Sequence, residues 1–133
     1  MEILVIDGMG GGIGKAIIEH IQQDFPAAQL TAVGTNSIAT AAMRKAGATL
    51  CATGENAVIY NAAKAQYIIG AIGIITANSM HGEISPKMAE AVSSSAAHKI
   101  LIPMEKCVTV LGVAAKPIAA YISEISAVLK TFD

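Results

Sequence analysis

Charged and aromatic residues are scarce in this sequence. Of its 133 residues, 14% are charged and 4% are aromatic, whereas 53% are hydrophobic. An average soluble domain carries about 25% charged residues. The net charge is −1 and the basic residues are spread along the chain, which argues against a nucleic-acid partner and against a membrane surface as partner. The apolar excess is typical of helices packed on a buried parallel sheet.

Cysteine and long apolar runs are also scarce. Cys51 and Cys107 lack CxxC spacing, so we expect two reduced thiols in a cytoplasmic protein. The longest apolar stretch, residues 67–77, is interrupted by glycine and is too short to span a bilayer. A strand beginning at Glu2 takes the place where a secretory signal would stand. The three histidines lie far apart in the sequence, so no metal site is predicted.

Apolar runs alternate with helical stripes along the whole chain. Strands are expected at residues 2–6, 30–33, 49–52, 67–70 and 99–102, with a sixth at 108–111. The link before residues 108–111 is too short for a parallel crossover, so this strand should run antiparallel at the sheet edge. The alternation predicts one Rossmann-like domain over residues 1–133. Its fold class is three-layer α/β/α, with a doubly wound, mostly parallel sheet of 5–6 strands and residues 2–6 at the centre.

A glycine-rich segment joins the first strand to the first helix. Glycine allows a sharp turn and a close approach of the backbone, and free amides at a helix N-terminus favour a negative charge. We therefore expect a nucleotide or another small phosphorylated ligand here. The candidate binding residues are Gly8, Gly10, Gly11, Gly12, Ile13 and Gly14. The alternative is that the glycines only permit a tight turn and close packing of the helix.

The spacing Gly-x-x-x-Gly-Ile-Gly resembles the nucleotide loop of short-chain dehydrogenases, which makes NAD or NADP a candidate cofactor. Asp7 replaces the small hydroxyl residue that precedes the loop in that family. A carboxylate beside a pyrophosphate is unfavourable unless its side chain points away or binds a ribose or an amide. Tyr60 and Lys64 match the family's Tyr-x-x-x-Lys pair, but they follow the third strand, and we interpret this match as chance.

Other polar residues follow the strands at the edge where ligands bind in doubly wound folds. After the second strand, Thr35 and Asn36 stand where an acidic residue usually binds the adenosine ribose. Thr53 and Asn56 follow the third strand, and Asn78 follows the fourth. All five are candidate ligand contacts. The alternative, strongest for Thr53, is that such residues simply cap helices.

The segment around His81 and Glu83 is the only place where a histidine, a carboxylate and a hydroxyl cluster. His81 could act as a general acid or base, with Glu83 orienting it. The alternative is that His81 is an ordinary surface loop residue. Because the fourth strand should neighbour the first, we expect both residues to face the ligand at the glycine loop.

These motifs together resemble an uncharacterised bacterial domain family of unknown function. The motifs are Asp-Gly-x-Gly-Gly-Gly-Ile-Gly-Lys, Gly-Thr-Asn, Ala-Thr-Gly-Glu-Asn-Ala, Ile-Gly-x-Ile-Gly-Ile and Gly-Glu-Ile-x-Pro-Lys-Met-Ala. The resemblance covers nearly the whole chain and implies a small stand-alone Rossmann-like domain. It carries no established activity, substrate or catalytic residue.

Three functions remain open from the sequence. The first is a module that binds a nucleotide or phosphorylated metabolite, the second a small enzyme with its active site between subunits, and the third an interaction protein with a structural glycine loop. The apolar excess also predicts a homo-oligomer, most simply a dimer. Its interface is expected at the final helix, beside Tyr121 and Val128. A tightly packed monomer is the alternative.

Overall fold

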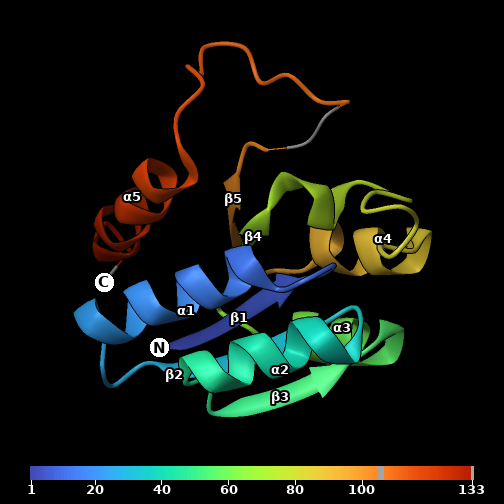
Figure 1. Cartoon of the computed structure of the whole chain (residues 1–133), viewed down its shortest axis with the longest axis horizontal. Helices are drawn as coiled ribbons and strands as arrows, with labels where there is room; N and C mark the ends of the chain where they lie inside the picture. The colour runs from blue at the N-terminus through green and yellow to red at the C-terminus, as the bar shows by residue number, and fades with distance from the viewer. Residues whose placement is uncertain (105–106, 133) are drawn as a thin grey trace.

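The strands form one parallel sheet in the computed structural model, which describes residues 1–104 and 107–132 (Figure 1). The strands are β1 (Glu2–Asp7), β2 (Gln29–Gly34), β3 (Leu50–Thr53), β4 (Tyr67–Ala71) and β5 (His98–Ile102). Their order is β3-β2-β1-β4-β5, and every neighbouring pair is parallel. The prediction of a Rossmann-like α/β fold with the first strand central is therefore confirmed.

Helices cover both faces of this sheet. The helices are α1 (Gly12–Asp24), α2 (Ser37–Ala46), α3 (Glu55–Ala62), α4 (Pro86–Ser94) and α5 (Ile118–Lys130), and a short 3₁₀ helix, η1 (Ile72–Ile75), follows β4. On one face α1, α2 and α5 pack against Val5 and Ile69, and on the other α3 and α4 pack against Leu4 and Ile6. Because alternate residues of β1 point to opposite faces, a continuous apolar run is what this central strand requires.

Local sequence explains where several helices begin and end. The Asn36 side chain accepts a hydrogen bond from the Ala39 amide at 2.9 Å and so caps α2. The same helix ends at Gly47, whose φ of 114° lies in the left-handed region that favours glycine. Ser85 caps α4 from the residue before Pro86, as the Ser-Pro pair predicts.

The sixth strand does not form, and this prediction was wrong. Residues 108–111 have no strand conformation and belong to an extended segment, residues 107–117, that leads back to α5 (Figure 1). We call this segment the arm. Its β-branched residues favour extended backbone, but a strand also needs a paired ladder. In the described part of the chain β5 pairs only with β4, and the Leu111 side chain is 92% exposed.

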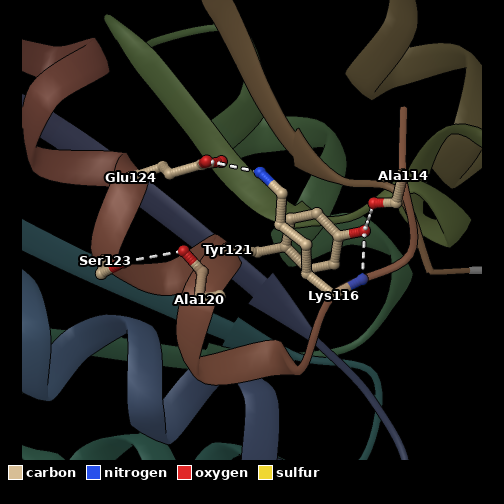
Figure 2. A network of polar contacts seen from close by, with 6 residues as sticks. All are labelled: Ala114, Lys116, Ala120, Tyr121, Ser123 and Glu124. Carbon is tan, nitrogen blue, oxygen red and sulfur yellow. Dashed lines mark hydrogen bonds and ion pairs between the residues drawn. The ribbon is translucent and has the colours of Figure 1, made fainter. Parts of the chain in front are cut away.

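Polar contacts fix the end of the arm to α5 (Figure 2). The Tyr121 hydroxyl donates a hydrogen bond to the Ala114 carbonyl at 2.9 Å and accepts one from the Lys116 amide at 3.1 Å. The Lys116 Nζ lies 2.7 Å from Glu124 Oε1, and this bond raises the pKa of the lysine above its ordinary range. The chain therefore enters α5 along a defined path.

The burial of residues in α5 differs in part from the burial expected from the sequence. Ile122, Ile125 and Leu129 are buried, as expected. Tyr121, which we expected to leave apolar surface beside the helix, is only 8% exposed, because its hydroxyl has partners within the chain. Phe132 lies beyond the helix and is 49% exposed, with its ring 4.2 Å from that of His98.

Candidate functional site

A cleft of about 680 Å³ lies at the carboxyl ends of β1 and β4. It sits where the strand order changes direction, with β2 and β3 on one side of β1 and β4 and β5 on the other. Open α/β sheets bind ligands at this kind of position, and small-molecule pockets have volumes of about 300–1,000 Å³. The lining residues of this glycine-loop cleft are Asp7, Gly8, Met9, Gly10, Gly11, Gly12, Ile13, Ala71, Met80, His81 and Met104.

Asp7 turns its carboxylate toward the backbone of the glycine loop. One oxygen accepts from the Gly8 amide at 2.8 Å and the other from the Gly14 amide at 2.6 Å. Asp7 therefore satisfies amides at the start of α1, a helix whose own N-cap supplies no side-chain bond. Burial raises the pKa of Asp7 above its ordinary value, the backbone amides of Gly14, Gly8 and Ile13 oppose that rise, and the charge of Glu83 adds to it.

Two glycines of the loop are required by packing. A Cβ on Gly11 would lie 2.8 Å from the Ala39 backbone, and the φ of Gly11 is 76°. A Cβ on Gly14 would lie 2.5 Å from the Met43 sulfur. At these two positions the structure supports the alternative in which glycine serves a tight turn and close helix packing.

Gly10 and Gly12 are different, because no contact among the described residues requires glycine there. Both are exposed, neither has a left-handed φ, and a Cβ on either would meet no atom within 4 Å. Within the described residues, neither backbone amide has a hydrogen-bond partner. Their open side lies along the cleft.

Glu83 joins three loops at this edge of the sheet. Its Oε1 accepts from the Met9 amide at 2.9 Å, from Asn36 Nδ2 at 2.9 Å and from the Thr35 hydroxyl. These bonds, that of Thr35 first, lower the pKa of Glu83 below its ordinary value. Gly8 permits the close approach, because a Cβ there would lie 2.6 Å from Thr35 Oγ1. We call Glu83, Met9, Thr35 and Asn36 the Glu83 latch.

Several predicted ligand contacts lie outside the cleft. Thr35 and Asn36 are used by the latch, and Asn36 also donates to the Met9 carbonyl at 3.0 Å. Thr53 is the last residue of the edge strand β3, and its hydroxyl bonds that of Thr40 at 2.7 Å. Asn56 lies in the first turn of α3. Thr53, Asn56 and Asn78 are not among the residues that line the cleft. The topology brings these loops to one edge of the sheet but not to one pocket.

His81 lines the cleft together with Gly12, as its position after β4 predicts. Within the described residues His81 has no hydrogen bond to Glu83, and Glu83 Oε1 is taken by the latch. The expected orienting role of Glu83 is therefore not seen. Asn78, Met80 and His81 have φ values of 66°, 56° and 57°, a left-handed conformation that is uncommon outside glycine.

The methionines of the cleft were missed by sequence reasoning. Met9, Met80 and Met104 come from the loops that follow β1, η1 and β5. Met9 is 51% exposed and Met104 is 40% exposed. The available signal was their position, since each follows a strand at the edge where ligands bind. With Ile13 and Ala71 they make one side of the cleft apolar.

Other groupings of reactive residues do not form a site. Ser126 Oγ lies 2.9 Å from His20 Nε2, and Asp24 Oδ2 lies 3.7 Å from the same nitrogen. A Ser-His-Asp relay needs both ring nitrogens, so this arrangement is not one. Lys64 Nζ lies 3.2 Å from the Tyr60 hydroxyl on an exposed surface outside the cleft. Across residues 1–104 and 107–132, no group of three or more His, Cys, Asp or Glu could hold a metal ion, and no helix is long and apolar enough to cross a bilayer.

A family model described as a domain of unknown function (DUF3842) matches residues 2–132. The chain belongs to this family. The resemblance noted from the motifs is therefore confirmed, and like the motifs it assigns no activity. A search of curated proteins finds no match to the chain.

The chain is similar in structure to the dodecameric FMN-dependent UbiX-like decarboxylase from Escherichia coli O157:H7. The TM-score is 0.55 and the sequence identity is 14%, over 99% of this chain and 94% of the other. At this identity the similarity shows a shared Rossmann-like fold.

Proposed function

We propose that this protein binds a nucleotide or another phosphorylated metabolite in the glycine-loop cleft. The observation that carries the proposal is the open side of Gly10 and Gly12. Packing explains Gly11 and Gly14, but at Gly10 and Gly12 the chain leaves both the Cβ position and the amide free. A ligand that approaches the backbone closely accounts for glycine at both positions.

The charges around α1 are compatible with one phosphate group. The N-terminus of a helix carries about half a positive charge, and Gly10 and Gly12, at the N-terminus of α1, both line the cleft. Asp7 is buried and lines the cleft, and its carboxylate accepts hydrogen bonds from the Gly8 and Gly14 amides. These two hydrogen bonds offset part of the negative charge of Asp7.

The structural similarity supplies a first ligand to test. The E. coli protein is FMN-dependent by its description, and FMN combines a planar ring with a single phosphate. The apolar side of the cleft, formed by Met9, Met80 and Met104, suits such a ring, because methionine sulfur makes favourable contacts with aromatic rings.

The experiment compares Gly12→Val with Ser37→Val. Gly12 and Ser37 are both exposed first residues of a helix, but only Gly12 lines the cleft. Calorimetric titration with FMN, AMP, ATP, NAD and NADP should show binding by the wild type and by Ser37→Val. Binding should be lost in Gly12→Val, while the thermal unfolding of both variants stays close to wild type. If the wild type binds no phosphorylated compound at millimolar concentration, the loop is structural and the proposal fails.

An enzymatic function is the second candidate, and His81 favours it. His81 lines the cleft and has a left-handed φ of 57°, a kind of strain that clusters at functional sites. In an enzyme, His81→Gln would abolish turnover of a bound ligand and leave its affinity within about threefold of wild type. A pure binding module would show no turnover in either protein.

We further propose that the protein is a homo-oligomer in which a second copy covers the arm. Val110, Leu111 and Val113 are 37%, 92% and 44% exposed, so the arm presents apolar side chains to water. The unpaired edge of β5 lies beside the same segment. Exposed apolar segments and free sheet edges are surfaces that become buried when subunits associate. The structurally similar E. coli protein is a dodecamer by its description, which is compatible with association of this fold.

A further inference from the structure

We infer that the cleft takes a mononucleotide, a planar ring with a single phosphate group, and excludes a dinucleotide. This inference rests on the proposed function, and it names the ligand class. It follows from a difference between the two sides of the glycine loop. The side toward β2 is closed by contacts within the chain, and the side toward β4 and β5 is open.

The side toward β2 is closed by the Glu83 latch. In dinucleotide-binding folds the adenosine ribose lies at the end of β2, where an acidic residue binds its hydroxyls. Here a carboxylate does reach that place, but it comes from the loop after β4 and is already bonded to Met9, Thr35 and Asn36. The Asn36 amide oxygen caps α2, and its nitrogen is shared between Glu83 and the Met9 carbonyl. The Asn36 amide and one oxygen of Glu83, Oε1, are therefore already occupied within the chain.

The side toward β4 and β5 is open and apolar. The cleft runs from the glycine loop to Ala71 and Met104, which lie at the ends of these two strands, and includes neither Thr35 nor Asn36. Met9 and Met104 both line the cleft and are 51% and 40% exposed. Exposed methionine surface is unfavourable in water, and a flat ring placed between these side chains would cover it.

The ionisable groups of the cleft also limit the charge of the ligand. Among the described residues that line the cleft, only Asp7 and His81 can carry a charge, and none of them is a lysine or an arginine. The two free amides of Gly10 and Gly12 can bind one phosphate group. A longer phosphate chain would bring further negative charge close to Asp7 and Glu83 without a cation to balance it.

The test compares matched pairs of probes on the full chain, FMN with FAD and AMP with NAD. Isothermal titration should give dissociation constants at least about tenfold lower for FMN than for FAD, or for AMP than for NAD, a difference of about 1.4 kcal/mol. Met80→Ala should weaken the binding of FMN and of riboflavin, which has the ring without the phosphate. Ile38→Ala is the control, because Ile38 is 70% exposed and does not line the cleft.

A variant of the Glu83 latch tests whether the β2 side of the glycine loop takes part in binding. Thr35→Val removes one donor to Glu83 and should leave the FMN affinity within about twofold of wild type, since Thr35 does not line the cleft. If FAD or NAD binds as tightly as its mononucleotide, or if Thr35→Val abolishes FMN binding, the inference is overturned and the proposed function stands. If none of the phosphorylated probes binds, the proposed function fails and the inference fails with it.

Discussion

Glu83 Oε1 accepts a hydrogen bond from the Met9 amide at 2.9 Å, and the two residues are 74 positions apart in the sequence. The contact ties the loop after β4 to the glycine loop across the point where the sheet changes direction. The same oxygen binds the loop after β2 through Thr35 and Asn36. A single carboxylate therefore sets the relative position of three loops around the cleft.

Glu83→Gln should destabilise the protein at neutral pH. The glutamine oxygen can still accept from the Met9 amide, but the hydrogen bonds lose their charge assistance. Because neutral hydrogen bonds contribute about 1 kcal/mol and charged ones about 1.5–3 kcal/mol, we expect a loss of about 1 kcal/mol in unfolding free energy. Urea denaturation measures it. Glu90→Gln is the control, an exposed glutamate without a side-chain bond among the described contacts, and an equal loss in both variants would contradict the role of the latch.

The destabilisation by Glu83→Gln should shrink in acid. The pKa of Glu83 is lowered in the folded protein, so ionised Glu83 contributes stability above its ordinary value of 4.5. That contribution is lost as the pH falls through the lowered folded pKa. Asp7, whose pKa is raised from 3.8, acts with the opposite sign, losing stability as the pH rises through its folded pKa. Asp7 is present in both proteins, so most of its contribution cancels in the difference between wild type and Glu83→Gln. The remainder is the coupling between the two carboxylates, because the charge of Glu83 raises the pKa of Asp7. Urea titrations between pH 3 and 7 test this, and a difference independent of pH would contradict it.

The pair Gly12→Ala and Gly14→Ala tests whether packing requires glycine at position 14 but not at position 12. At Gly14 the new Cβ would lie 2.5 Å from the Met43 sulfur, and overpacking of this kind costs about 1–3 kcal/mol. At Gly12 it would meet nothing within 4 Å, so the change should be neutral or stabilising by up to about 1 kcal/mol. Thermal or urea unfolding of both variants gives the comparison. A similar loss at both positions would show that Gly12 also serves packing.

The sheet was predictable because its signals are local. The apolar run from Ile3 to Ile6 can only be buried on both faces, and Asn36, Gly47 and Ser85 mark helix ends through contacts with near neighbours. The prediction of a sixth strand was wrong because it rested on a local signal alone. Residues 108–111 carry the local preference for a strand, but the pairing that makes one depends on distant residues.

The site was predictable only in outline. The glycine loop and His81 were identified because they follow β1 and β4, which lie side by side. The latch could not be read from one sequence, since Glu83 and Thr35 are separated by 48 positions and either side chain has many possible partners. Thr35 and Asn36 were therefore assigned to a ligand, when their donors serve Glu83.

Leu111→Asp should dissociate the proposed oligomer without unfolding the subunit. The Leu111 side chain is 92% exposed on the arm, so in an isolated chain this substitution should change stability by no more than about 0.5 kcal/mol. In an oligomer that covers the arm, the same change places a charge in an apolar interface and should favour separate subunits. Size exclusion with light scattering at micromolar concentration compares the two proteins, with Ile38→Asp as an exposed apolar control away from the arm. A wild-type mass of 13.6 kDa across the peak would show that the arm stays uncovered. A mass that both substitutions leave unchanged would place the interface elsewhere.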